Sequence, residues 1–165
     1  MSRILTFKEA NSLGEFITTS TFLKQLESSY PEFNSWYWNK VIPKIALDKD
    51  NYSGTKILHL YNKDELIGIS ILKRSNNEKK LCALRIKEQY QSKGYGLYLI
   101  DESLKRLQVD KPLCSVSEDL INTYSRIFIN KYLFNISYVY KNIYAKDKLE
   151  YEFNGNSNLK IKTPY

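Results

Sequence analysis

A glycine-containing stretch, Gln91–Gly96, is the feature that most constrains how this 165-residue chain can fold. It reads QSKGYG and lies between an apolar run typical of a strand and an amphipathic run typical of a helix. Glycine permits positive φ and lets another group approach the main chain closely. The first N–H groups of a helix lack intrahelical acceptors and carry partial positive charge, so such a turn suits phosphate or another anion. The sequence therefore predicts an anion site where this strand meets this helix.

The order of the expected elements is that of an α/β protein. Strands are predicted over residues 2–7, 56–61, 66–73, 79–86, 111–116, 136–144 and 149–153. Helices are predicted over residues 21–47, with interruptions at Pro31 and Pro43, over 97–107 and from 118 onward, where Ser117 is the N-cap. The core side of the middle helix is expected to carry Leu97, Ile100, Leu104 and Leu107.

The strands between residues 56 and 86 are expected to pair antiparallel. A parallel crossover is expected to lead from the strand 79–86 through the helix 97–107 to the strand 111–116, which is short and apolar like an interior parallel strand. The fold class is therefore α/β, with a mixed, mostly antiparallel central sheet and helices on both faces.

Composition limits the class of protein. The net charge is +7 and the sequence pI is about 9.2, but Lys and Arg are dispersed, which favours a solvated basic surface and leaves nucleic-acid binding as the alternative. No apolar run approaches the ~20 residues of a membrane span, and the N-terminus shows no signal peptide. Two cysteines in apolar stretches indicate reduced, buried thiols and a cytoplasmic protein.

Two common phosphate-binding loops do not fit the glycine stretch. Nothing in the chain matches the Walker A pattern G-x-x-x-x-G-K-[ST]. A Rossmann fingerprint needs a third glycine at position 99, which is Leu99, and the preceding strand follows a hairpin rather than opening a βαβ unit.

The stretch from Gln91 to Gly96 has the pattern Q-x-x-G-x-G, which resembles the acyl-CoA-binding motif of the GNAT N-acetyltransferase superfamily. The similarity extends upstream over LRIKEQYQSKGYG, with Glu88 where the family often has proline, and over the element order of nearly the whole chain. The resemblance implies a GNAT fold, with one acyltransferase domain over residues 1–155 and a tail over 156–165. It also implies acetyl-CoA as co-substrate, an amine acceptor, and a monomer or homodimer. Neither a metal nor a membrane is expected as a partner.

The resemblance also implies roles for particular residues. Backbone N–H groups from Ser92 to Leu97 would hold the pyrophosphate of coenzyme A, and Lys93 would add a cation. The pantetheine arm would lie along Leu84–Ile86, where the N–H of Ile86 would polarise the thioester carbonyl. The full set implied for the cofactor is Leu84, Arg85, Ile86, Gln91, Ser92, Lys93, Gly94, Tyr95, Gly96, Leu97 and Asn122.

The acid, the base and the acceptor site are expected on less regular features. The family's N-x-x-A-x-x-x-Y pattern aligns Asn122 with its asparagine and Ile129 with its catalytic tyrosine, so Tyr132 becomes the candidate acid. Glu88, at the end of the strand, is the candidate base. The aromatic triplet Trp36, Tyr37 and Trp38 is expected to contact the acceptor, with a core position for at least one tryptophan as the alternative.

Three functions remain open from the sequence. The first is acetyl transfer to an amine of a small molecule or protein. The second is a toxin that acetylates aminoacyl-tRNA, and the third is a non-catalytic module that binds acyl-CoA. His59, the only histidine, is expected on a sheet face, and with two distant cysteines it gives no zinc spacing.

Overall fold

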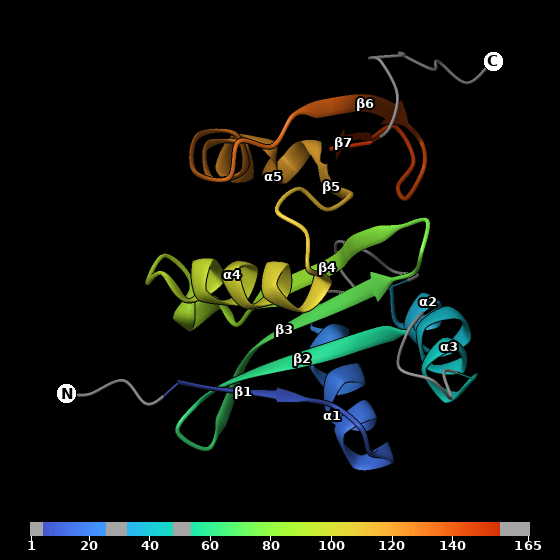
Figure 1. Cartoon of the computed structure of the whole chain (residues 1–165), viewed down its shortest axis with the longest axis vertical. Coiled ribbons are helices and arrows are strands. Elements are labelled where there is room, and N and C mark those ends of the chain that lie inside the picture. The colour runs from blue at the N-terminus through green and yellow to red at the C-terminus, as the bar shows by residue number, and fades with distance from the viewer. Residues whose placement is uncertain (1–4, 26–32, 48–53, 156–165) are drawn as a thin grey trace. The chain divides into compact units, whose positions relative to one another are not determined.

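The computed structural model describes residues 5–25, 33–47 and 54–155, in two compact units that divide after Leu107 (Figure 1). The first unit holds a four-stranded antiparallel sheet in the order β1 (Leu5–Glu9), β2 (Thr55–Asn62), β3 (Glu65–Arg74) and β4 (Lys79–Ile86). The second unit holds a three-stranded antiparallel sheet in the order β5 (Cys114–Ser117), β7 (Leu149–Phe153) and β6 (Ile136–Lys141).

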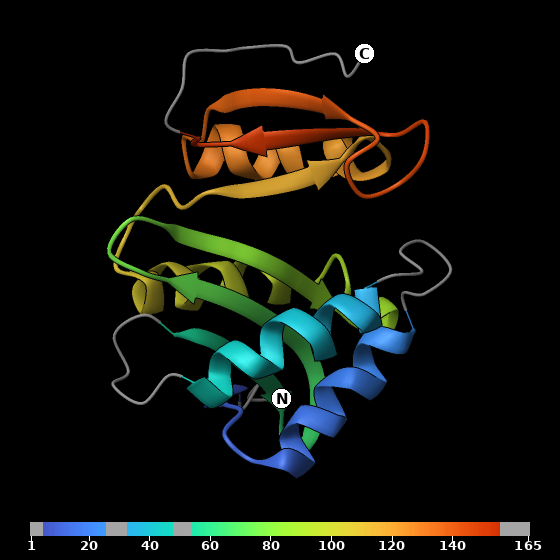
Figure 2. The ribbon, with the colours of Figure 1, turned by 90° about the vertical axis from the view of Figure 1, so that its right-hand side faces the viewer.

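Helices cover both faces of the first sheet, as the sequence predicts. Figure 2 shows α1 (Leu13–Lys24) and the segment α2–η1–α3 (Phe33–Trp36, Tyr37–Val41, Ile42–Leu47) in front of the sheet, with α4 (Tyr95–Leu107) behind it. Alternation of side chains along the strands explains this arrangement. Ile69 and Ile71 pack in the core under α1, whereas Ser70 between them hydrogen-bonds Ser103 of α4 at 2.9 Å.

In the second unit, α5 (Glu118–Ser125) and the π-helix η3 (Arg126–Lys131) lie against one face of the sheet. The Phe128 ring lies 5.3 Å from that of Phe153 and 5.1 Å from that of Phe134, and all three are buried. Ser117 takes the predicted N-cap position, although its side chain makes no capping hydrogen bond.

All the predicted strands are found, with changes in bounds and in one pairing: β5 spans Cys114–Ser117 rather than 111–116, and β6 ends at Lys141 rather than at 144. The first strand spans Leu5–Glu9 rather than 2–7, and residues 2–4 and the tail 156–165 lie outside the described residues. The antiparallel pairing of β2, β3 and β4 is confirmed. However, β5 pairs antiparallel with β7, and the pairs found in the described residues include no parallel pairing of β4 with β5. An apolar run indicates a buried strand, but it does not determine the direction of its partner.

The first helix begins at Leu13, eight residues before the predicted start. Ser12 and Glu15 form a capping box there: the Glu15 N–H donates to Ser12 Oγ at 3.4 Å, and the Ser12 N–H donates to Glu15 Oε2 at 3.1 Å. The Ser-x-x-Glu spacing was visible in the sequence and indicates this start.

Pro43 does not interrupt the second helical segment, contrary to the prediction; Pro31 lies outside the described residues. The chain passes through one π-helical turn, in which the Ile42 N–H donates to the carbonyl of Tyr37, five residues earlier. A widened turn just before a proline accommodates its ring and its missing N–H, so the helix continues.

The buried face of α4 differs in part from the predicted one. Ile100 and Leu107 are buried as expected, but Leu97 and Leu104 are only half-buried. Tyr95, Leu99 and Ser103 are the other buried residues of this helix. Periodicity identifies the helix, but the angle at which it crosses β3 and β4 decides which neighbouring ridge contacts the sheet.

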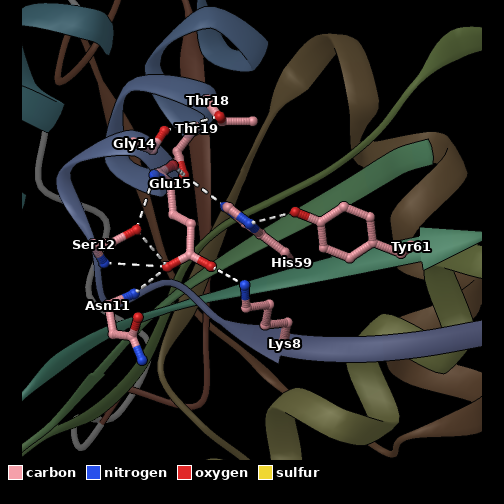
Figure 3. Close-up of polar contacts among 9 residues, drawn as sticks. All are labelled: Lys8, Asn11, Ser12, Gly14, Glu15, Thr18, Thr19, His59 and Tyr61. Atoms are coloured by element: carbon pink, nitrogen blue, oxygen red, sulfur yellow. Dashed lines mark hydrogen bonds and ion pairs between the residues drawn. The ribbon is translucent and has the colours of Figure 1, made fainter. Parts of the chain in front are cut away.

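A polar network fastens α1 to the first sheet (Figure 3). Thr19 Oγ1 donates to the carbonyl of Glu15 at 3.0 Å and lies 2.7 Å from His59 Nε2, while the Tyr61 hydroxyl lies 3.3 Å from His59 Nδ1. Because the Thr19 hydroxyl donates its proton to the Glu15 carbonyl, it accepts from His59, so Nε2 is the protonated ring nitrogen. The unprotonated Nδ1 then accepts from the Tyr61 hydroxyl. Burial lowers the pKa of His59 to about 4, which makes it a neutral histidine on a sheet face, as predicted.

Candidate functional site

The glycine loop lies where the sequence places it, between an edge strand and the N-terminus of a helix. β4 is the last strand of its sheet and is followed by a 3₁₀ turn, Glu88–Tyr90. The backbone adopts left-handed φ at Ser92 (57°) and Gly94 (84°), and α4 starts at Tyr95. The Gly94 carbonyl accepts from the N–H groups of Leu97 (3.1 Å) and Tyr98 (3.3 Å), so Gly94 is the N-cap of α4.

The structure explains the need for glycine at only one of the two glycine positions of the loop. Gly94 is required by its own conformation, because a φ of 84° is costly for residues with a Cβ. Gly96 is not, because a Cβ built there would meet only Cγ1 of Ile86, at 4.0 Å, among the described residues. Internal packing therefore does not explain Gly96, whereas an external group approaching the start of α4 would.

The backbone of Ile86 points to the outer edge of the sheet. The Lys87 N–H donates to the Ile67 carbonyl at 2.9 Å and continues the β3–β4 ladder. Hydrogen bonding alternates along an antiparallel pair, so the N–H and C=O of Ile86 point away from β3. The Ile86 carbonyl accepts from Nε2 of Gln91 at 3.0 Å. The Ile86 N–H lies on the same outer edge of the strand, where the sequence predicts the path of the coenzyme.

Gly68 of β3 supports this edge, and sequence reasoning missed it. A Cβ at Gly68 would come within 2.5 Å of the Ile86 side chain and 3.1 Å of the Arg85 carbonyl. A side chain at this position would therefore push the Ile86 side chain aside and crowd the Arg85 carbonyl. An isolated glycine within a strand run was the available signal for such a close approach.

The cations and polar groups of the loop have partners within the protein. Lys93, predicted near phosphate, donates to the Gln89 carbonyl at 2.7 Å and lies 5.8 Å from the centre of the Tyr90 ring. Arg85 donates to the Leu84 carbonyl at 2.7 Å and lies over the Phe33 ring. The first turn of α4 contains no acidic residue, whereas those of α1 and α5 do. The helix dipole at this end therefore favours an anion without local competition.

The predicted acid, base and Asn122 are placed on separate elements. Glu88 is exposed in the 3₁₀ turn that precedes the glycine loop. In the second unit, Asn122 is exposed on α5, and Tyr132 is half-buried at the end of the π-helix. The centres of the Tyr132 and Phe134 rings are 5.7 Å apart, and Nζ of Lys131 lies 5.2 Å from the centre of the Tyr132 ring. Tyr132 follows directly after the π-helical turn η3, and its role as the acid stays a prediction.

The aromatic triplet divides between core and partly exposed positions. Tyr37 is fully buried rather than on an acceptor surface, and its hydroxyl donates to the Phe16 carbonyl at 2.9 Å. Burial raises the pKa of Tyr37 to about 12. Trp36 and Trp38 are half-buried against the same core, and Nε1 of Trp38 donates to Ser20 Oγ at 2.9 Å. A triplet in a helical segment presents three directions, and the sequence does not say which one faces inward.

Replacing Tyr37 by phenylalanine is therefore expected to lower the free energy of unfolding by about 1 kcal/mol, because the Phe16 carbonyl loses its buried donor. Urea unfolding measures the change, with Tyr144→Phe as the matched control, since Tyr144 is 57% exposed. If the Tyr37→Phe variant kept the stability of wild type but lost acetyl transfer, Tyr37 would instead have a role in binding the acceptor.

The cysteines and the possible metal ligands are the alternative sites to compare with the glycine loop in the part of the chain that the structure describes. Burial raises the pKa of the Cys82 thiol to about 11, so it is protonated at neutral pH, and Cys114 is buried. Residues 5–25, 33–47 and 54–155 contain no group of three or more His, Cys, Asp or Glu side chains that could hold a metal ion. None of the helices in these ranges is long and apolar enough to cross a membrane.

Comparison with solved structures identifies the fold. The chain is similar to a Desulfovibrio desulfuricans protein assigned to the GNAT acetyltransferase family, with a TM-score of 0.70 and 13% identity over 91% of this chain and 97% of the other. It is similar to the ribosomal-protein-S18-alanine N-acetyltransferase of Escherichia coli, with a TM-score of 0.66, 13% identity and 91% and 92% coverage. A Bacillus subtilis acetyltransferase in complex with CoA matches with a TM-score of 0.61, 14% identity and 90% and 97% coverage.

These matches span both compact units, so the chain has the GNAT fold that the sequence resemblance implies, while the predicted parallel crossover is not found in the described residues. No family model matches the sequence, and no curated protein is similar to it. At 13–14% identity the likeness establishes the architecture, and the activity follows only from the residues of the site.

Proposed function

We propose that this protein is an N-acetyltransferase that transfers the acetyl group of acetyl-CoA to an amine. The observation that carries the proposal is Gly96, which leaves open space at the start of α4 with no internal packing reason. This open position belongs to a Q-x-x-G-x-G loop that follows an edge strand, in a chain with the GNAT fold. CoA-bound structures are found among its structural neighbours.

In this proposal, the first unit binds the coenzyme. The N–H groups from Ser92 to Leu97 hold the pyrophosphate at the N-terminus of α4, where the helix dipole favours negative charge. The pantetheine arm runs along the outer edge of β4 from Leu84 to Ile86. Gln91 fixes the carbonyl of Ile86, which keeps the adjoining peptide groups of this edge in place.

The reaction is a direct attack of a neutral amine on the thioester carbonyl. A carbon–nitrogen bond forms, and the developing oxyanion is stabilised by the N–H of Ile86. The carbon–sulfur bond then breaks, the coenzyme A thiolate leaves, and the base keeps the proton lost by the amine. Glu88 is the proposed base, and Tyr132 is the proposed acid that protonates the thiolate.

The acceptor is proposed to be an amine of a small molecule or a protein. The Escherichia coli neighbour is named for an alanine of a ribosomal protein, and another neighbour was solved with a Gag peptide and CoA. These names describe the neighbours, and they make peptide amines the first acceptors to test here.

The test is to measure thiol release from acetyl-CoA in the presence of peptide amines, small-molecule amines and aminoacyl-tRNA, with mass spectrometry of the acceptor. Release of one thiol per acetylated peptide or small-molecule amine supports the proposal. Acetylation of aminoacyl-tRNA alone would identify the toxin activity. Tight acetyl-CoA binding without turnover would identify a non-catalytic module, and no binding would overturn the proposed function.

The variants Glu88→Gln and Tyr132→Phe are each expected to lower kcat by about 100-fold, because each removes one proton-transfer group. Glu102→Gln serves as the control for loss of a carboxylate outside the proposed site, since Glu102 pairs with Arg106 and Lys105 on α4. Wild-type kcat in both variants would assign the proton transfers to water or to other groups.

A further inference from the structure

One carboxylate holds the turn that precedes the glycine loop. Glu65 accepts hydrogen bonds from the Tyr90 hydroxyl, from Nζ of Lys87 at 3.0 Å and from Nε2 of Gln89 at 3.5 Å. All three donors come from the short segment between β4 and the loop. Glu65 itself is the first residue of β3, 25 residues before Tyr90, so tertiary structure alone brings the groups together.

The segment that Glu65 holds is connected to the coenzyme loop on both sides. The Tyr90 ring packs edge-on against Tyr95, the first residue of α4, with ring centres 5.8 Å apart and planes at 72°. Nζ of Lys93, inside the loop, donates to the Gln89 carbonyl at 2.7 Å. A displacement of the Glu88–Tyr90 turn would therefore move both the start of α4 and the middle of the loop.

Stability does not explain this cluster. The side chain of Glu65 is 42% exposed, and an ion pair at such a position contributes little to the free energy of folding. The hydrogen bond from Tyr90, followed by that from Lys87, lowers the pKa of Glu65, and the same bond raises the pKa of Tyr90. The contacts thus keep the carboxylate charged and the phenol protonated, which is the state that fixes their geometry.

We propose that Glu65 is a positioning residue for coenzyme A binding: through Tyr90, Lys87 and Gln89 it holds the loop in the conformation that accepts the pyrophosphate. The inference rests on the proposed function. A loop that is already ordered loses less conformational entropy when the ligand binds, so its anchor contributes to affinity without contacting the ligand.

The test is calorimetric titration of the full chain with acetyl-CoA for wild type, Glu65→Gln, Tyr90→Phe and the double variant. Each single change is expected to raise Kd about fivefold to tenfold, with no comparable fall in thermal stability. The double variant should be no weaker than the worse single variant, because both changes remove the same contact. In turnover, KM for acetyl-CoA should rise while kcat stays constant.

Glu102→Gln is the control, since it removes another carboxylate of the same unit, one that pairs with Arg106 and Lys105 among the described residues. It should bind acetyl-CoA like wild type. If wild type binds and Glu65→Gln binds within about twofold of it, the positioning role is refuted while the proposed function stands. If wild type does not bind acetyl-CoA, the proposed function fails and this inference fails with it.

Discussion

Replacing Gly96 by glutamate is expected to abolish acetyl-CoA binding while the chain stays folded. Gly96 has room for a side chain, since a Cβ meets only Ile86 at 4.0 Å, and its φ is not in the left-handed region. The new carboxylate would stand where the pyrophosphate is proposed to bind. Two like charges about 4 Å apart near a protein surface repel by several kcal/mol, so the affinity should fall by about 100-fold or more.

The measurement is calorimetry with acetyl-CoA, supported by circular dichroism to show that the fold is retained. Gly14→Glu is the matched control, because Gly14 lies in the first turn of α1 with equally open surroundings. That variant carries the same added charge at another helix N-terminus and should bind normally. If both variants bound acetyl-CoA like wild type, the pyrophosphate would not lie at α4, and the proposed function would lose its main support.

A smaller change at the same position separates a functional glycine from a structural one. Alanine is a better helix former than glycine by up to about 1 kcal/mol, and α4 has space for it. A glycine retained for folding would make the substitution destabilising. The open surroundings of Gly96 instead imply that alanine raises stability while its methyl group obstructs the coenzyme, so the two properties should move in opposite directions.

The glycine loop could be predicted from the sequence because its determinants are local. Gly94 and Gly96 lie between a strand run and a helical run that are about ten residues apart in the sequence, and in the structure Gly94 precedes α4 while Gly96 is its second residue. The backbone direction of Ile86, by contrast, depends on how β4 pairs with β3. A shift of one residue in that pairing would turn its N–H toward Ile67, and single-strand patterns do not determine such a shift.

Roles that depend on contacts between residues far apart in the sequence could not be predicted from local sequence patterns. In the sequence, Glu65 is a carboxylate in a turn at the start of a strand, and no neighbouring residue indicates that Tyr90 is its partner. Tyr37 is one of three consecutive aromatic residues, and only the π-helical turn and the packing of α1 decide that it is the buried one. In both cases the missing information is tertiary: which faces meet, and at what angle.

The buried histidine gives the second prediction of large effect, a loss of stability in acid. His59 is fully buried, and its pKa is about 4 in the fold against an ordinary value of 6.5. The unfolded chain therefore binds a proton at a higher pH than the folded chain. Stability is fully present above about pH 6.5, falls as the pH drops toward 4 and loses about 3 kcal/mol over this interval. Glu15, with a pKa lowered to about 2 chiefly by the Asn11 N–H, adds a separate loss only below about pH 4.5.

The substitution His59→Gln isolates this contribution, because glutamine carries an amide in place of the ring and does not titrate. Its free energy of unfolding should fall by about 3 kcal/mol less than that of wild type between pH 7 and pH 4. Urea unfolding followed by tryptophan fluorescence reports on the correct unit, since Trp36 and Trp38 pack against the same core as α1 and β2. Parallel pH curves for the two proteins would mean that His59 becomes protonated in the fold at the same pH as in the unfolded chain. In that case Nδ1 would be a donor, and the Tyr61 hydroxyl would have to accept from it rather than donate.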